Sequence, residues 1–581
     1  MASTAQRILI VGGVAGGVSA AARLRRLNED AEIIIFERGP HVSFANCGLP
    51  YYLGREIQEH GALTLESPQT LAEKLNLDVR IHHEVKSIDR QRREIEVWDS
   101  HNHVATRESY DALILAMGAA PIRPPIPGID RPGHFTLRNI ADMDVIEAWI
   151  REERPETAVI VGGGFIGLEL AEQLDQRGIR VTVIEALDQV MAPLDLEMAT
   201  LLHEELDRNE IALSLGDPVT AFVDPSLPDE RGKASTVLLK SGERVAADLV
   251  VIGIGVRPET SLAREAGLEL GDLGGIRVNE RMQTSDPSIW AVGDVIEVKN
   301  PVTGQWSLVP LGGPANRQGR IAADTIVGRQ SVYRGTLGTA ILRLFSLTAG
   351  CTGVNEKTLQ RLHVDYRAVH LHPNHHAGYY PNASRMAMKI LFSPGDGRLL
   401  GAQIVGAAGV DKRIDVFATA LQAGMTVHDL AALELSYAPP FGSAKDPVNL
   451  AGMIAQNILA GDVSMAHWPE ALAASESSDS QKPLIMDVRD EDEFAEDSLP
   501  GAVNIPLSQV RDRLPELASH AERDIIVHCA TGQRSYYACR ILSQRGFRRV
   551  RNLSGALKTL NPMRVARASA AANADALPSS R

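Results

Sequence analysis

Apolar and polar positions follow one another in a pattern that occurs twice in this chain. Residues 8–11 form a short apolar run that leads into the glycine-rich segment 12–17, a helical stretch follows at 19–28, and a second apolar run at 32–36 ends on Glu37. This order predicts a strand, a tight turn, a helix and a second strand. The first apolar run is too short for an export signal or a membrane span, so it is interpreted as a strand.

The second copy lies at residues 158–161, 162–167 and 181–184, with a helical stretch to Arg177 and an acidic residue, Glu185, at the end. Two such units in one chain predict two α/β domains with parallel strands. Glycines in these turns let the backbone approach a pyrophosphate, and the terminal acid accepts ribose hydroxyls.

The two glycine turns differ in how fully they match a dinucleotide-binding turn. The second has Gly162, Gly164 and Gly167, whereas Val14 in the first copy stands where the middle glycine usually lies. The alternative is a tight turn that binds nothing. Because each copy also has its strand, helix and acid in place, the sequence favours two dinucleotide sites.

The pattern changes at about residue 335. A mixed segment follows, with helical stretches near 415–424 and 450–459 and a strand near 387–391, which predicts a packing or dimerisation domain. Residues 462–482 are rich in Ala, Ser and Glu and predict a linker. The Ala/Ser/Arg-rich end of the chain has no periodicity and predicts a disordered tail.

Composition and charge limit the classes of partner. The 581 residues are 44% hydrophobic, and 59 Lys and Arg against 73 Asp and Glu give a net charge of −14. This charge makes nucleic acid and membrane surfaces poor partners. Four cysteines in so long a chain do not form a disulfide framework, and no apolar stretch is long enough to cross a bilayer, so a cytoplasmic location is expected.

Two further segments indicate the cofactors: Leu113 to Gly118, before a proline-rich turn, and Ile289 to Asp294. With these, residues 6–460 resemble the flavoprotein disulfide reductases that have two dinucleotide domains. The resemblance implies FAD in the first domain, with Asp294 on the ribityl chain, and NAD(P)H in the second. The FAD-binding residues it implies are Gly12, Gly13, Ala15, Gly16, Gly17, Glu37, Arg38, Ala116, Gly118, Asp294, Pro310 and Ala315. Those for NAD(P)H are Gly162, Gly164, Phe165, Ile166, Gly167, Glu185 and Gly255, and Glu185 favours NADH, with NADPH as the alternative.

The segment around Cys47 distinguishes the branches of that family. Relatives with a redox disulfide have a second cysteine five positions later, where this chain has Tyr52. The remaining chemistry is a single thiolate that attacks an S–S bond and keeps one half as a mixed disulfide or persulfide. If a helix begins at Leu49, its dipole together with the cationic partners of a bound substrate is expected to lower the pKa of Cys47.

This segment, together with 314–320 and 436–441, resembles the coenzyme A disulfide reductases. The resemblance implies coenzyme A as substrate or ligand and a homodimer in which tyrosines reach the partner's cysteine. The coenzyme A positions are Ser19, Arg23, Arg26, Ser43, Asn46 and Lys445, although a solvated helix face is equally expected for Arg23 and Arg26 taken singly. The tyrosines are Tyr437 and either Tyr379 or Tyr380.

Two alternatives stay open for the cysteine. Related single-cysteine enzymes reduce peroxide or oxygen through a sulfenic acid, but they typically carry a histidine where this chain has Ala15. The other alternative is a redox-sensing flavoprotein in which oxidation of Cys47 changes a partner contact.

The C-terminal region carries a second cysteine chemistry. Segments 484–489, 500–506 and 525–535 resemble the rhodanese family, with Cys529 as the sulfur carrier and Arg534 adding positive charge to its loop. Phosphatases of similar fold use a related cysteine loop, typically one residue longer, so sulfur transfer is favoured. Cys351 and Cys539 lack such a setting and are expected in the core.

The predicted fold is α/β, with two Rossmann-like dinucleotide-binding domains, an α+β dimerisation domain and a C-terminal rhodanese-like α/β domain. The predicted boundaries are 1–149 and 269–334 for the FAD domain, 150–268 for the NAD(P)H domain, 335–461 for dimerisation, 462–482 for the linker, 483–563 for the rhodanese domain and 564–581 for a disordered tail. The predicted enzyme is an NADH-dependent reductase of coenzyme A disulfide, persulfide or polysulfide. No metal is expected.

Overall fold

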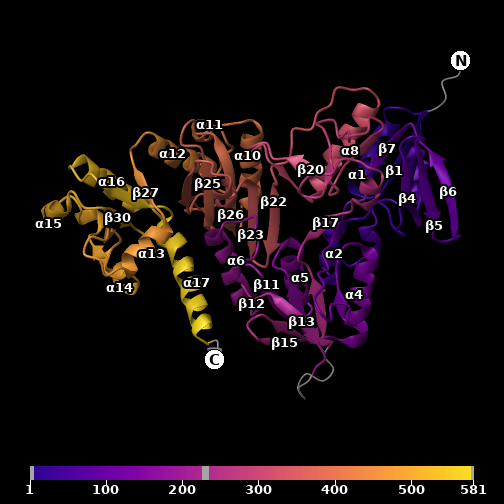
Figure 1. The fold of residues 1–581 in the computed structure, drawn as a ribbon. Coiled ribbons are helices and arrows are strands. Elements are labelled where there is room, and N and C mark those ends of the chain that lie inside the picture. Colours follow the sequence, from indigo (N-terminus) through magenta and orange to yellow (C-terminus); the bar gives the residue numbers. More distant parts are fainter. Residues whose placement is uncertain (1–5, 226–233, 577–581) are drawn as a thin grey trace. The chain divides into compact units, whose positions relative to one another are not determined.

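The computed structural model describes residues 6–225 and 234–576 (Figure 1). The chain divides into two compact units, one made of residues 1–188 and 211–338 and the other of residues 189–210 and 339–581. Each unit is described by itself.

The first unit contains two five-stranded parallel sheets. The strands of the first, in spatial order, are β19 (Ile289–Ala291), β7 (Ala112–Leu115), β1 (Arg7–Val11), β2 (Glu32–Phe36) and β3 (Asp78–Arg80). Those of the second are β12 (Ala212–Leu215), β11 (Arg180–Glu185), β10 (Thr157–Val161), β16 (Leu249–Ile252) and β9 (His134–Phe135). Residues 8–10, 33–35 and 113–115 are buried on both faces of their sheet, as expected for parallel strands that helices cover.

Helices and smaller sheets complete this unit. The helices are α1 (Ala15–Arg25), α2 (Leu49–Leu53), α3 (Pro68–Leu75), α4 (Ile140–Glu153), α5 (Phe165–Asp175), α7 (Ser261–Glu265) and α8 (Gly312–Ile326). The three-stranded sheets are β4 (His83–Asp89), β5 (Glu94–Asp99) and β6 (Val104–Ser109), then β13 (Val219–Val223), β14 (Ser235–Leu239) and β15 (Arg244–Ala247), and finally β18 (Ile276–Arg277), β20 (Ile296–Lys299) and β21 (Trp306–Ser307). Strands β8 (Ala119–Pro121) and β17 (Val256–Pro258) pair with each other. The start of α4 shows why a helix forms where it does, since Asn139 and Asp142 cap each other's backbone amides.

The second unit has an antiparallel sheet and a parallel one. The antiparallel sheet has the order β22 (Ala340–Leu344), β23 (Leu347–Gly353), β26 (Leu399–Gly406), β25 (Met386–Phe392) and β24 (Arg367–Leu371). Its helices are α6 (Leu196–Arg208), α9 (Glu356–Arg361), α10 (Val410–Gln422), α11 (Val427–Ala432) and α12 (Pro447–Leu459). The predicted helices at 415–424 and 450–459 and the strand at 387–391 fall on α10, α12 and β25.

The parallel sheet is C-terminal and has the order β27 (Ser464–Ala466), β31 (Val550–Leu553), β30 (Ile525–His528), β28 (Leu484–Asp487) and β29 (Val503–Asn504). Its helices are α13 (Trp468–Glu476), α14 (Glu491–Glu496), α15 (Leu514–Leu517), α16 (Gln533–Gln544) and α17 (Ala556–Ala576).

The prediction of a linker at 462–482 is wrong, because these residues contain β27 and α13. Strand β27 extends the C-terminal sheet by pairing with β31, and Ala471, Leu472 and Ala474 of α13 are buried in that domain's core. Alanine is a strong helix former whose small side chain lets a helix approach a sheet closely. The alanines of this segment therefore belong to a packed helix and do not indicate disorder.

The prediction of a disordered tail from residue 564 is also wrong for 564–576, since α17 continues to Ala576. Leu557, Leu560 and Met563 recur every three residues and bury one side of the helix, which explains its start. In Figure 1 α17 runs beside α6, and the hydroxyl of Thr200 on α6 lies 3.4 Å from the sulfur of Met563. Residues 577–581 lie outside the described part of the chain.

Candidate active sites

The first glycine turn connects β1 to α1. Gly12 has φ of +104°, and a Cβ there would collide with the carbonyl oxygen of Ala116 at the end of β7. A Cβ on Gly17 would collide with the carbonyl oxygen of Gly12. The carboxylate of Glu37 accepts the N–H of Gly13 at 2.9 Å, so the acid and the turn are fixed to each other.

The second turn repeats this construction between β10 and α5. Gly162 has φ of +110°, and a Cβ on Gly167 would collide with the carbonyl oxygen of Gly162. A Cβ on Gly164 would face open space. Glu185 accepts the N–H groups of Gly163 at 2.8 Å and Leu187 at 2.9 Å. Of the other predicted residues, Phe165 and Ile166 begin α5, and Gly255 takes φ of +110° directly before β17.

Asp294 follows β19 and lies half-buried near the first turn. Burial raises its pKa to about 6, against the opposing charge of Arg138, and no hydrogen bond to its carboxylate occurs within the described residues. A carboxylate with unfilled acceptor sites beside a glycine cradle fits the ribityl hydroxyls of a flavin. The residues present therefore fit FAD.

The remaining predicted flavin residues lie in α1 and α8 and in the segments that follow β2 and β7 or precede α8. Gly118 takes φ of +73° just after β7, and Ala315 lies buried in α8. Helices α1 and α8 pack so closely that a Cβ on Gly319 would collide with the carbonyl oxygen of Gly16. Ala15 and Gly16 begin α1, Ala116 directly follows β7, and Pro310 directly precedes the turn into α8. Arg38 forms an ion pair of 2.8 Å with Glu259.

Cys47 lies in a 3₁₀ turn (Asn46–Gly48) just before α2 and is exposed. The side-chain oxygen of Asn46 accepts the Cys47 N–H at 3.1 Å and lies 3.8 Å from the thiol. The expected lowering of the pKa is wrong for the unliganded chain, because partial loss of water around the thiol and the charges of Glu169 and Asp294 raise the pKa of Cys47. Helix α2 has only five residues, so its dipole is too weak to reverse this.

Glu169 and Tyr51 are part of this site but were missed in the sequence. Tyr51 on α2 donates a hydrogen bond of 3.1 Å to Glu169 on α5, and Arg177 donates one of 2.7 Å to the carbonyl of Leu53. Helix α2, which directly follows the cysteine turn, is thus fastened to the helix of the second glycine turn. The available signal was an acidic residue two positions after Gly167 in an otherwise apolar stretch.

The predicted coenzyme A residues fall into both units. Ser19 on α1 hydrogen-bonds to Asn316 on α8, and Arg23 forms an ion pair of 2.7 Å with Asp324. Arg26 is exposed and has no ion pair within the described residues. Ser43 takes the left-handed conformation and donates its N–H to the carbonyl of Gly13 at 2.8 Å, so it joins the cysteine segment to the first turn. Lys445 lies in the second unit and is exposed.

The structure distinguishes the two adjacent tyrosines. The hydroxyls of Tyr379 and Tyr437 lie 3.0 Å apart, both rings are exposed, and this hydrogen bond raises the pKa of Tyr379. Tyr380 instead packs its ring edge-on against His376. Tyr379 is therefore the tyrosine that accompanies Tyr437.

The second cysteine loop runs from β30 into α16. The sulfur of Cys529 is buried and accepts the N–H of Gly532 at 3.2 Å and the hydroxyl of Ser535 at 3.5 Å. Arg534 is held by both carboxylate oxygens of Glu493, at 2.6 and 2.8 Å, so its charge acts on the sulfur only from this fixed position. These contacts suit an anionic sulfur at Cys529. Cys351 and Cys539 are buried, which confirms their expected place in the core.

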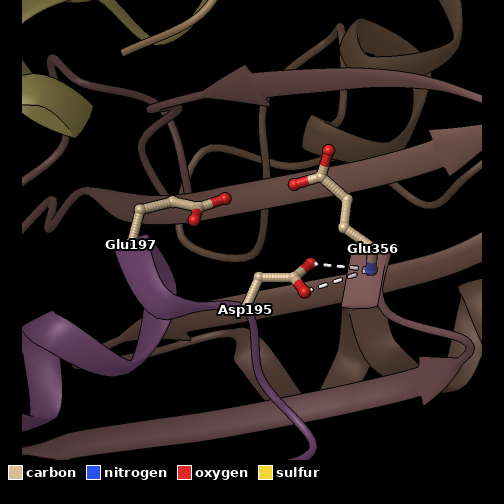
Figure 2. A group of neighbouring side chains, drawn as sticks. All are labelled: Asp195, Glu197 and Glu356. Carbon is tan, nitrogen blue, oxygen red and sulfur yellow. Dashed lines mark hydrogen bonds between the residues drawn. The ribbon is translucent and has the colours of Figure 1, made fainter. Parts of the chain in front are cut away.

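Three carboxylates gather in the second unit, at Asp195, Glu197 and Glu356. Figure 2 shows them converging, with the backbone N–H of Glu356 bonded to Asp195. The ammonium group of Lys389 lies 2.8 Å from Asp195 and 2.5 Å from Glu197, and it also contacts Glu356. Lys389 thus takes the position that a metal cation would take.

Known proteins show which family has this architecture. Residues 6–317 match the family model described as pyridine nucleotide-disulphide oxidoreductase. The chain belongs to this family. Residues 339–447 match the dimerisation domain of the pyridine nucleotide-disulphide oxidoreductases, and residues 470–561 match the rhodanese-like domain. The predicted fold class and the resemblance are confirmed.

The matches to individual relatives extend over nearly the whole length of each relative. The coenzyme A disulfide reductase of Staphylococcus haemolyticus is 34% identical over 454 residues, which is 78% of this chain and 100% of that protein. Reduced Bacillus anthracis CoADR-RHD has a crystal structure with a TM-score of 0.92 and 46% identity, covering 96% of this chain and 98% of the other. The NAD-dependent persulfide reductase from A. fulgidus has a TM-score of 0.87 and 37% identity, covering 95% and 100%.

Family membership makes the chain a flavin-dependent NAD(P)H oxidoreductase with an appended rhodanese domain. Within residues 6–225 and 234–576, no helix combines the length and the apolar character that crossing a membrane requires.

Proposed function

We propose that the chain uses NADH to reduce coenzyme A disulfide and coenzyme A persulfide or polysulfide through Cys47, while Cys529 carries sulfane sulfur. The observation that carries the proposal is the single exposed thiol of Cys47, with Tyr52 where a second redox cysteine would stand. The names of the relatives that match over their whole length, coenzyme A disulfide reductase and NAD-dependent persulfide reductase, support this substrate class.

The chemistry at Cys47 starts with its thiolate. The thiolate attacks one sulfur of the substrate, the S–S bond breaks, one half stays on Cys47 as a mixed disulfide or persulfide, and the other half leaves as a thiolate that takes up a proton. FAD, when bound, accepts the hydride of the nucleotide and supplies the electron pair for sulfur. In sum, NADH, a proton and a disulfide give NAD⁺ and two thiols, and a persulfide substrate gives one thiol and hydrogen sulfide.

The nucleotide preference rests on Glu185. Its carboxylate is held by two backbone N–H groups at the end of β11, so it cannot turn away from a ligand in the second glycine turn. A fixed carboxylate accepts the 2′- and 3′-hydroxyls of NADH and repels the 2′-phosphate of NADPH.

The coenzyme A group would be recognised by charge and by a second copy of the chain. Arg26 is available for a phosphate, whereas Arg23 is already held by Asp324. The exposed pair Tyr379 and Tyr437 would, in a homodimer, supply hydroxyls to the Cys47 site of the other copy and protonate the leaving thiolate. The match to the family's dimerisation domain supports the dimer.

The test is anaerobic NADH oxidation by the FAD-loaded protein with coenzyme A disulfide, coenzyme A persulfide, polysulfide and peroxide as separate substrates. Cys47→Ser should abolish turnover of the sulfur substrates but keep reduction of the flavin by NADH. Cys529→Ser should abolish sulfur transfer from a sulfane donor only. Cys351→Ala, which changes a buried thiol away from both loops, serves as the matched control and should keep both activities.

Reduction of peroxide or oxygen is the second candidate, because a water-forming NADH oxidase from Lactobacillus brevis matches 79% of this chain at 28% identity with a TM-score of 0.75. Ala15 in the first glycine turn argues against it. Turnover with peroxide alone would replace the proposed substrate class. Flavin reduction without turnover of any substrate would point to a redox sensor.

A further inference from the structure

Two histidines at the end of β24 contact the segment that joins β31 to α17. The backbone N–H of His370 donates to the hydroxyl of Ser554 at 2.9 Å, and the ring Nδ1 of His370 lies 3.1 Å from the same oxygen. The ring of His372 lies 2.9 Å from the hydroxyl of Thr559. A Cβ on Gly555 would collide with the side chains of Thr559 and His370, so the two segments touch. The rhodanese domain is therefore docked on the dimerisation sheet through this junction.

The same junction holds the sulfur loop. The N–H of Leu557 donates to the carbonyl of Cys529 at 3.3 Å, and the N–H of Lys558 donates to that of Ala530 at 3.0 Å. The first turn of α17 thus fixes the backbone on which the sulfur of Cys529 is carried. The same loop carries the Gly532 N–H that points at the sulfur at 3.2 Å.

On its other side His370 is held by the buried charges of Figure 2. Its Nε2 lies 2.8 Å from Glu197, which Lys389 contacts at 2.5 Å. A carboxylate only accepts, so Nε2 carries a hydrogen and donates it to Glu197, while Nδ1 lies within hydrogen-bond distance of the Ser554 hydroxyl. The imidazole is buried, and its orientation is fixed from both ends.

We propose that His370 is a positioning residue for the sulfur-transfer loop: anchored by Glu197, it fixes Ser554 and, through the first turn of α17, the backbone of Cys529. The proposal rests on the proposed sulfur transfer at Cys529. His370 does not touch the reacting sulfur and acts through the loop geometry. Small displacements of a preorganised loop are costly for catalysis, because the amide donor must stay aimed at the sulfur.

The test compares His370→Ala and Ser554→Ala with wild type in sulfur transfer from thiosulfate and polysulfide to cyanide. The expected result for both is a kcat lowered roughly tenfold with the donor KM changed less than about twofold, since the loop is displaced but the donor is still bound. Alkylation of Cys529 by iodoacetamide, followed on its own peptide by mass spectrometry, should slow by a similar factor. NADH-driven reduction at Cys47 should be unchanged.

Two further variants separate positioning from general destabilisation. His370→Gln keeps one donor and one acceptor and should restore most of the kcat, whereas His428→Ala removes an exposed histidine of α11 and should have no effect. Retention of wild-type kcat and alkylation rate by both His370→Ala and Ser554→Ala would overturn the proposal, as would equal loss of reductase activity in them. A wild-type protein that transfers no sulfur would refute the proposed function instead, and the alkylation rates would still decide the positioning role.

Discussion

Replacement of Lys389 by methionine should destabilise the second unit strongly. Lys389 is fully buried, and its ammonium group contacts three carboxylates. Methionine keeps most of the apolar stem and removes only the charge. Burial alone would raise the pKa of Glu197, but Lys389 and His370 outweigh burial and hold that pKa well below its usual range. The variant therefore leaves three carboxylates facing one another without this cation.

The size of the effect follows from the spacing of the carboxylates. Their oxygens lie within 4.8 Å of one another, and two unit charges at about that separation repel by ~3.5 kcal/mol at an effective dielectric constant near 20. Protonation of the carboxylates limits the total, so the free energy of unfolding should fall by about 3–5 kcal/mol near pH 7.5, the range found when one partner of a buried ion pair is removed.

The pH dependence gives the sharper signature. Without Lys389, burial and the two neighbouring carboxylates should raise the folded pKa of Glu197 above its unfolded value. Protonation then favours the folded state, and the variant should regain stability as the pH falls from 7.5 to 5.5. In wild type the Glu197 pKa is lowered, so its contribution is present above the unfolded pKa and is lost only at lower pH. Calcium should stabilise the variant alone, because three carboxylates without the ammonium form an oxygen site.

The assay is urea unfolding at both pH values, with hydrogen exchange of the β25 amides to assign the change to this sheet. Lys74→Met, which removes an exposed lysine paired with Glu66, is the matched control and should cost less than about 1 kcal/mol. A Lys389→Met protein within about 1 kcal/mol of wild type at pH 7.5, or one that loses stability between pH 7.5 and 5.5, would refute the electrostatic reasoning.

Three other predictions concern the first unit. Asp294→Asn should weaken FAD binding, measured by equilibrium dialysis, at least about tenfold through loss of a charged acceptor. Because burial raises the Asp294 pKa to about 6, the FAD-free wild type should also gain stability as the pH falls from 7 to 5, whereas the variant should not. Glu169→Gln should lower the pKa of Cys47 by removing one of the charges that raise it. Iodoacetamide alkylation of the FAD-free variant should then reach half its maximal rate at a lower pH than in wild type. An unchanged pH profile would exclude Glu169 from this role. Glu185→Ala should raise the ratio of kcat/KM for NADPH over NADH at least about tenfold, since a fixed carboxylate is removed from the ribose position; an unchanged ratio would place the preference elsewhere.

The glycine turns were predictable because their constraints are local. Gly12 and Gly162 need positive φ, and any side chain there would collide with a neighbouring strand end, so the pattern records the fold directly. The single-cysteine chemistry was predictable for the same reason. Tyr52 occupies the position of the second redox cysteine, so the sequence alone excludes the internal redox disulfide with Cys47.

The features that the sequence did not show depend on distant residues. The raised pKa of Cys47 comes from loss of water and from Glu169 and Asp294, which no local pattern connects to the cysteine. The ion pair of Arg23 with Asp324 on another helix has no signal in the local sequence either. Likewise Ala471 and Ala474 pack only because strands far along the chain cover them.

The docking of the rhodanese domain shows why its boundaries exceed the family match at 470–561. Strand β27 precedes that match, pairs with β31, and accepts the N–H of Ser554 at the carbonyl of Ala466, 2.9 Å away. Met563 follows the match and contacts α6 through Thr200. Ser554 and Thr559 also contact His370 and His372 of the dimerisation sheet. The C-terminal end of the domain is thus fixed, and the domain cannot swing as a body without breaking these contacts. Sulfur chemistry at Cys529 therefore depends on residues such as His370 that lie outside the domain that carries the cysteine.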